Sequence, residues 1–336
     1  RPNRDEQREE RRREAARHTG LMKAAFGRET DEAIENARIY EEGEGRSLLW
    51  GAEAAAAAEA AKRAAEMAEA DAEGAQAGNE EAREAAEIAE GAAEEAAESD
   101  AVAPTVTETT VKVVTSFAPE ALYRDATGKT MIVDGGAYED GAFGPEQILC
   151  SESNLYPILV AHKRDFYDKN RDYRRGSLFT DRALYVPEVL FSRGGDVRRA
   201  DVLVIAEPIR AYALENHRSE RGVETALRAR VEALLRVAAA NGAETLIMGA
   251  FGCGRNGYPV EQVIELIQNW IAEHPGAVPN VVFAVPRMHA DAFREAFGAP
   301  EPERPAPVVV AEGENDREGD DEDWRNVELP EGVTLR

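Results

Sequence analysis

Short apolar runs alternate with amphipathic helical patterns over residues 105–298 of the chain. The apolar runs predict strands, which lie at 111–114, 131–133, 184–191, 201–206, 245–249 and 281–285. The helical patterns lie at 146–160, 224–240, 259–272 and 290–297. A chain that alternates strands with helices folds into a mostly parallel sheet with helices on both faces. We therefore predict an α/β fold of three layers, α/β/α, around a mixed sheet, with Pro187 placing its strand near an edge.

Segments of different composition flank this region. Residues 1–50 are rich in charge and predict a helical arm. Residues 51–104 are mainly Ala and Glu, which favours helix without an apolar stripe wide enough for a core. We expect an exposed helical hairpin or a fraying helical insertion there, since no Leu or Ile heptad supports a coiled coil. Residues 299–336 are rich in Pro and then acidic, which is typical of a disordered tail.

The charge balance excludes several classes of partner. Lys and Arg number 40 and Asp and Glu number 65, which gives a net charge of −25. Nucleic acids and anionic membranes are held by basic surfaces, so we expect neither as a partner. The 2 Cys and 5 scattered His show no disulfide framework and no metal-ligand spacing. These residues indicate a reducing compartment, and we expect a cytoplasmic protein that holds no metal.

A glycine-rich loop at 134–147 follows the apolar run at 131–133 and leads into a predicted helix. Gly135 and Gly136 let the backbone approach a ligand, and the helix N-terminus beyond them favours an anion. The alternative is an ordinary tight turn. The acidic residues of the loop lack the alternation of an EF-hand, so we expect solvated carboxylates rather than a calcium site. These residues are Asp134, Glu139 and Asp140.

A second glycine loop, at 249–257, follows the predicted strand at 245–249. Ligands of open α/β sheets collect at the carboxyl ends of the strands, where both loops lie. Two such loops can hold a diphosphate from both sides. Cys150 and Cys253 are expected to be small buried residues rather than reactive thiols.

The two loops and the residues between them resemble the microbial-type poly(ADP-ribose) glycohydrolases, a branch of the macrodomain fold. That family carries Gly-Gly-Gly, a short spacer and Gln-Glu-Glu. The corresponding residues here are Gly135-Gly136-Ala137 and Pro145-Glu146-Gln147. The resemblance continues through 149–150, 153–156, 166–171, 178–181, 185–193 and, as its most specific match, 249–254. It covers about residues 105–298, with a weaker likeness at 13–22.

The resemblance implies binding of ADP-ribose or an ADP-ribosylated protein, without a cofactor and with the diphosphate between the two loops. The ligand-binding residues that it implies are Asp134, Gly135, Gly136, Ala137, Tyr138, Phe143, Gly252, Cys253, Gly254, Arg255, Asn256 and Gly257. Asp134 stands near the position of a macrodomain contact to adenine, and Tyr138 and Phe143 either cover the ribose or anchor the loop. In the family, the second Glu of the motif protonates the departing ribosyl oxygen, and water captures an oxocarbenium-like centre. The catalytic positions here are Glu146 and Gln147.

Departures from the family motif leave three hypotheses open. Gln147 can hydrogen-bond a ribose but cannot donate and recover a proton. Ala137 adds a methyl group near the phosphates, and Asn256 stands where the family has an aromatic residue. A glycohydrolase of weak or altered activity would depend on Glu146, whereas a catalytically silent ADP-ribose reader would follow from Gln147. The third hypothesis is an interaction protein that acts through its Ala/Glu-rich helix.

Overall fold

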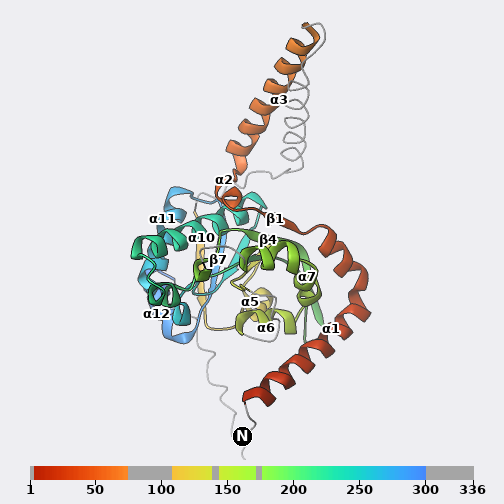
Figure 1. Cartoon of the computed structure of the whole chain (residues 1–336), viewed down its shortest axis with the longest axis vertical. Helices are drawn as coiled ribbons and strands as arrows, with labels where there is room; N and C mark the ends of the chain where they lie inside the picture. Colours follow the sequence, from red (N-terminus) through yellow and green to blue (C-terminus); the bar gives the residue numbers. More distant parts are fainter. Residues whose placement is uncertain (1–3, 75–107, 138–143, 172–175, 300–336) are drawn as a thin grey trace, which may run out of the picture. The chain divides into compact units, whose positions relative to one another are not determined.

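The computed structural model describes residues 4–74, 108–137, 144–171 and 176–299, and seven strands in these ranges form one sheet (Figure 1). The strands are β1 (Arg38–Tyr40), β2 (Thr110–Val114), β3 (Thr130–Asp134), β4 (Ala183–Arg193), β5 (Asp196–Ile205), β6 (Thr245–Met248) and β7 (Asn280–Ala284). The α-helices are α1 (Arg4–Glu35), α2 (Glu44–Ser47), α3 (Gly51–Gly74), α5 (Ala118–Arg124), α6 (Gly144–Ser151), α7 (Leu155–Ala161), α8 (Lys169–Arg171), α9 (Arg210–Glu215), α10 (Glu220–Ala240), α11 (Val260–Glu273) and α12 (Arg287–Phe297). A π-helix spans Lys163–Asp168, and 3-10 helices span Gly176–Leu178 and Gly254–Asn256.

Parts of the sequence-based predictions fall outside these ranges. The acidic tail from residue 300 onward and the Ala/Glu-rich segment after residue 74 are among them. The first part of that Ala/Glu-rich segment is helix α3, as its composition predicts. Of the helices that the structure describes, none has the length and apolar character that crossing a bilayer requires.

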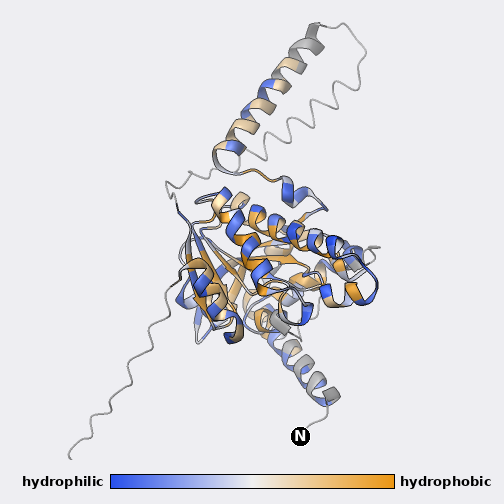
Figure 2. Cartoon of the chain, turned by 90° about the vertical axis from the view of Figure 1, so that its left-hand side faces the viewer, coloured by the Kyte–Doolittle hydropathy of each residue, from blue (hydrophilic) through white to orange (hydrophobic). Residues whose placement is uncertain are grey.

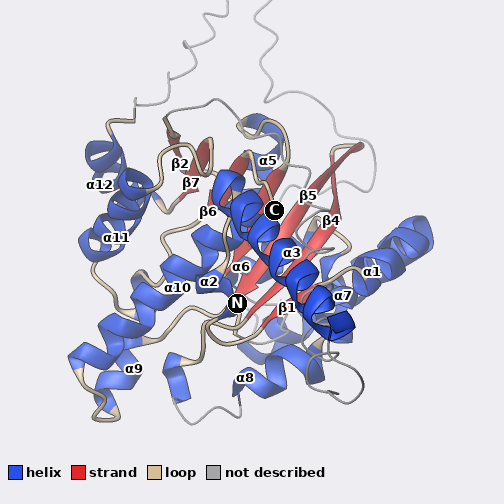
Figure 3. Cartoon of the chain, turned by 90° about the horizontal axis from the view of Figure 1, so that it is seen from above, coloured by secondary structure: helices blue, strands red, loops and turns tan. Residues whose placement is uncertain are grey.

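The sheet is mixed, with strand order β1-β4-β5-β3-β6-β7-β2. The five strands from β5 to β2 are parallel to their neighbours, whereas β4 is antiparallel to both β5 and β1. Figure 3 shows the strands running between groups of helices. The predicted α/β fold with a mixed sheet is confirmed.

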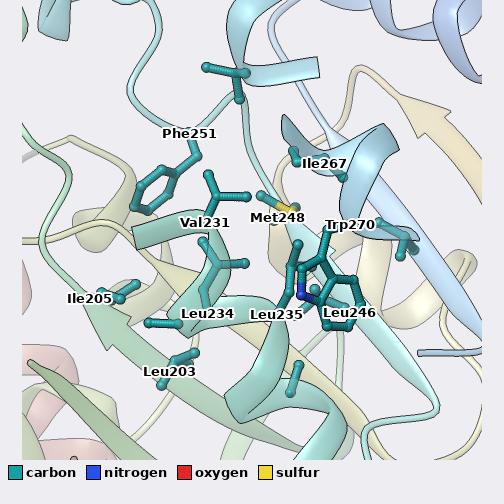
Figure 4. Packing of buried hydrophobic residues seen from close by; sticks show 14 of the residues in the cluster. Leu203, Ile205, Val231, Leu234, Leu235, Leu246, Met248, Phe251, Ile267 and Trp270 are labelled. Atoms are coloured by element: carbon teal, nitrogen blue, oxygen red, sulfur yellow. The ribbon is translucent and has the colours of Figure 1, made fainter. Parts of the chain in front are cut away.

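Each face of the sheet has its own hydrophobic core, because successive side chains of a strand point to opposite faces. In β5, Leu203 and Ile205 face one core, and Val202 and Val204 face the other. The first core contains buried residues of α10, α11 and α12, and Figure 4 shows Leu234 and Trp270 within it. The second contains buried residues of α5, α6 and α7. Figure 2 shows the mainly hydrophobic strands between helices whose outer surfaces are hydrophilic.

The sheet extends further at one edge than the sequence pattern predicted. Residues 38–40, expected in a helical arm, form β1 and pair with 183–185 of β4. The segment predicted near an edge, 184–191, lies in β4, one strand in from that edge. Pro187 lies beyond these paired residues, within a register shift between Val186 and Val189. A Pro has no N–H for a ladder hydrogen bond, so a bulge is where it can be accommodated.

The single helix predicted at 146–160 is instead two helices, α6 and α7, and polar side chains between them explain the break. The Ser153 hydroxyl donates to the Leu149 carbonyl at 2.6 Å and accepts from the Leu155 N–H at 3.2 Å. Asn154 is fully buried, and its amide accepts from the Leu190 N–H and donates to Thr30 of α1, both at 3.0 Å. Side chains that bond to nearby backbone in this way compete with helical hydrogen bonds.

A buried arginine fixes the carboxyl end of β5. Arg230 of α10 is 1% exposed. Its Nε donates to the carbonyl of Ala206 at 3.0 Å, and its Nη2 donates to the carbonyl of Leu178. The Arg230 side chain thus holds the chain that leaves β5 against the segment that precedes β4.

We predict that Arg230→Ala lowers the free energy of unfolding by about 3 kcal/mol, because it leaves a cavity and removes a donor from two buried carbonyls. Urea unfolding measures this change. Arg228→Ala, at an exposed position of the same helix, is the matched control and should change the free energy by less than about 0.5 kcal/mol. Equal effects of the two substitutions would contradict the role given to Arg230.

Candidate functional site

Three chain segments follow the carboxyl ends of the central strands, which lie on the same side of the sheet. The central order is β5-β3-β6, and all three strands are parallel. Asp134 ends β3, Glu207 lies two residues after β5, and the second glycine loop follows β6. The Glu207 N–H donates to the carbonyl of Gly135 at 3.2 Å, which joins the first two segments directly. Open α/β sheets bind their ligands at these carboxyl ends of the strands.

Carboxylates lie against both glycines of the first loop. A Cβ atom on Gly136 would lie 2.5 Å from Oε1 of Glu146 and 3.1 Å from Oδ1 of Asp134. A Cβ atom on Gly135 would lie 2.6 Å from Oε1 of Glu207. Real Cβ atoms do not show contacts of 2.5 or 2.6 Å, and one of 3.1 Å is tighter than most, so the absence of a side chain at both positions lets the three acidic groups approach the backbone.

Asp134 and Glu146 form a buried carboxyl pair. Asp134 is 1% exposed and Glu146 is 5% exposed. Burial raises the pKa of Asp134 to about 6, although hydrogen bonds from the Gly136 N–H and with Glu146 act in the opposite direction. The Gly136 N–H donates to Oδ1 of Asp134 at 2.9 Å. Neighbouring buried carboxyl groups cannot both ionise readily, so the pair retains a proton closer to neutral pH than a solvated carboxyl would.

Tyr167, from the π-helix, completes this group. Its hydroxyl donates to Oε1 of Glu146 at 3.2 Å. Burial, together with the negative charges of Glu146 and Asp134, raises the pKa of Tyr167 well above its ordinary value. The phenol therefore remains a hydrogen-bond donor that orients Glu146 in the first turn of α6.

Glu207 is a further acidic residue of the site that the sequence reasoning did not single out. It accepts hydrogen bonds from the Asn256 side-chain amide and the Gly252 N–H. Burial raises its pKa to about 7, and the negative charge of Asp134 adds to that effect. The available signal was positional: Glu207 is a carboxylate directly beyond a strand whose apolar run predicts burial on both faces.

Positive backbone angles shape the second loop. Gly252, Gly254 and Gly257 have φ of 76°, 65° and 88°, values that residues with a side chain rarely adopt. Cys253 is buried, and burial raises the pKa of its thiol to about 12, in line with the expected small buried residue. Arg255 is exposed.

The structure brings together several residues that were predicted from the two loops, but it assigns some of them different contacts. Asp134 was expected to be a solvated carboxylate; this is wrong, because it is buried beside Glu146. Asn256, noted for the loss of an aromatic ring, donates to Glu207. Gln147 and Ala137 are partly exposed, and Ala137 is the last described residue before the gap in the first loop. Tyr138 and Phe143 lie outside the described residues.

The acidic groups do not form a metal centre. Within the described part of the chain, no group of three or more His, Cys, Asp or Glu side chains has an arrangement suited to a metal ion. The described acidic residues Asp134, Glu146 and Glu207 place carboxyl groups beside glycine backbone at the carboxyl end of the central strands.

Known structures share this fold. A poly(ADP-ribose) glycohydrolase from Thermomonospora curvata is 20% identical, with a TM-score of 0.59 over 86% of this chain and 98% of that chain. A poly(ADP-ribose) glycohydrolase from Deinococcus radiodurans, in complex with ADP-ribose, is 20% identical, with a TM-score of 0.58 over 80% of this chain and 96% of that chain. At these identities the likeness shows the fold alone.

Sequence comparison identifies the family. Comparison with curated protein sequences gives no significant match. The family model described as "Microbial-type PARG, catalytic domain" matches residues 17–194, which is more than half of the 336 residues. The match begins within α1 and ends after β4. It includes both the Gly135-Gly136-Ala137 and the Pro145-Glu146-Gln147 segments of the first loop, and the chain belongs to the microbial-type poly(ADP-ribose) glycohydrolase (PARG) catalytic-domain family.

Proposed function

We propose that this protein binds ADP-ribose units and hydrolyses the ribosyl O-glycosidic bond of ADP-ribosylated substrates. Membership of the family and the fold shared with a glycohydrolase solved in complex with ADP-ribose support the ligand class. The observation that carries the catalytic part is the buried Asp134–Glu146 pair, since hydrolysis of a glycosidic bond needs a carboxyl group that keeps its proton near neutral pH.

In the proposed mechanism, Glu146 is the general acid and Asp134 positions and supplies its proton. Glu146 donates the proton to the departing ribosyl oxygen as the bond from C1 of the ribose breaks. Water then attacks the oxocarbenium-like carbon and returns a proton to the pair, which restores the starting state. Water is the only co-reactant. Gln147 hydrogen-bonds the ribose but transfers no proton, because an amide does not titrate in this range.

A second candidate function, a catalytically silent ADP-ribose reader, is favoured by one observation. Gln147 stands at the second Glu position of the family motif, where the resemblance places the acid. In a reader, the Asp134–Glu146 pair would only hold the first loop in its binding conformation. The two candidates share a ligand and differ in whether that ligand is cleaved.

Replacement of the proposed acid separates the two functions. We expect Glu146→Gln to lower the rate of ADP-ribose release from poly(ADP-ribose) by about 100-fold or more, because the amide cannot supply the proton. Binding of free ADP-ribose, measured by calorimetric titration, should change far less. Glu265→Gln, at an exposed position of α11, is the control and should retain full activity. Hydrolysis that survives Glu146→Gln would show that the acid has been assigned wrongly, and a wild-type protein that binds ADP-ribose without cleaving it would be a reader.

Restoring the family motif tests the rest of the site. We expect Gln147→Glu to raise the rate of ADP-ribose release by at least about tenfold, since it adds a second carboxyl at the start of α6. The measurement is the initial rate on poly(ADP-ribose) at saturating substrate. An unchanged rate would mean that the departures of the first loop from the family motif leave a carboxyl at 147 unable to reach the ribose.

The carboxyl pair should also reduce stability at high pH. The pKa of Asp134 is raised from 3.8 to about 6, so its contribution to stability is fully present below pH 3.8 and is lost as pH rises through about 6. We expect Asp134→Asn to be more stable than the wild type above that range, by on the order of 2–3 kcal/mol, with the difference vanishing in acid.

Urea unfolding over the pH range measures this difference. Asp31→Asn, which removes the same charge from an exposed position of α1, controls for the change in net charge. A less stable Asp134→Asn protein at high pH would contradict the retained proton, because it would mean that ionised Asp134 stabilises the fold.

A further inference from the structure

The side chain of Glu207 bridges the two glycine loops. Its Oε2 accepts from the side-chain amide of Asn256 in the second loop. Its Oε1 faces Gly135 in the first loop, 2.6 Å from the position that a Cβ atom would take there. The Glu207 backbone is fixed as well, since its N–H donates to the Gly135 carbonyl at 3.2 Å. A carboxylate therefore lies in the space between the loops.

The donors that Glu207 uses are those that a bound phosphate would need. The Gly252 N–H and the Asn256 amide point at its carboxylate, and backbone N–H groups of glycine loops are common phosphate ligands. Gly135 provides the close backbone approach on the other side. An ionised Glu207 is thus an anion already bound in an anion site, and a diphosphate placed there would meet a like charge at short range.

We propose that the Glu207 side chain occupies the phosphate site between the two glycine loops, and that a diphosphate binds there only when Glu207 is neutral or displaced. This inference rests on the proposed binding of ADP-ribose and adds a condition to it. The protein would bind its ligand with uptake of a proton, and its affinity would fall as the pH rises.

The groups around Glu207 define the pH range of this effect. Burial raises the pKa of Glu207 to about 7, so its neutral form is populated near neutral pH. Asp134, at the end of β3, has a pKa of about 6 and titrates in an overlapping range. Cys253, in the second loop, has a pKa of about 12 and stays neutral. Two arginines lie nearby: Arg210 of α9 donates to the Gly257 carbonyl at 3.4 Å and to Glu220, and Arg230 of α10 donates to the carbonyl of Ala206, the residue before Glu207.

The test is calorimetric titration of the full chain with ADP-ribose at about pH 6 and about pH 8. The phosphates of ADP-ribose do not titrate in this interval, so a change in affinity reports on the protein. We expect the wild-type Kd to be about tenfold higher at the upper pH. Glu207→Gln keeps the volume of the side chain and removes its charge, so its Kd should be about tenfold below that of the wild type at the upper pH, with a weaker pH dependence.

Glu207→Ala removes the occupant altogether and should also bind more tightly than the wild type at the upper pH. Glu215→Gln, at an exposed position of α9, removes one charge outside the site and should bind like the wild type. If Glu207→Gln does not fold, the wild-type pH profile and Glu207→Ala still test the proposal. Binding by a Glu207 variant where the wild type shows none would support it.

Each remaining result overturns a definite statement. A wild-type affinity that is independent of pH and equal to that of both variants would remove the role of Glu207 and leave ADP-ribose binding intact. Weaker binding by both variants would make Glu207 a ligand contact instead of an obstacle. If neither the wild type nor the two variants bind ADP-ribose at either pH value, the proposed function itself is overturned.

Discussion

The parallel pairing of β5, β3 and β6 is the constraint on which the rest of the site depends. Neighbouring strands have their carboxyl ends on the same side of the sheet only when they are parallel. Here those ends lead to Glu207, to Asp134 with the first glycine loop, and to the second glycine loop. Arg230 stabilises this arrangement, because it donates a hydrogen bond to the carbonyl of Ala206, the residue before Glu207. Asp134 and Glu207 lie close together because each follows one of two paired parallel strands, β3 and β5.

The strand and helix pattern could be predicted from the sequence wherever a strand is buried on both faces. Runs such as 201–206 carry apolar residues at nearly every position, because each face of the sheet has its own core. The three residues of β1 could not be found in this way, since so short a segment carries no periodic signal and its pairing with β4 is a long-range event. The break between α6 and α7 depends on Thr30 and Leu190, which are distant in sequence from Asn154.

The candidate site was predictable in its backbone and less so in its side chains. The glycines and Glu146 could be identified because a turn between strand and helix has a sequence signature. The burial of Asp134 could not, because it results from packing against Glu146 and Tyr167, which come from two further elements. Glu207 carries no motif, and its relation to Gly135 exists only once β5 and β3 are paired. Burial turns these ordinary acidic residues into groups that hold protons near neutral pH.

The strand order also explains how the domain carries its Ala/Glu-rich segment. β1 and β2 lie at opposite edges of the seven-stranded sheet, so the chain between them has to cross its width, roughly 29 Å at the usual strand spacing. The connection, residues 41–109, is much longer than this distance requires. The entropic cost of closing a loop grows only with the logarithm of its length. The connection between the two edge strands can therefore gain or lose many residues while the pairing of the central strands stays the same.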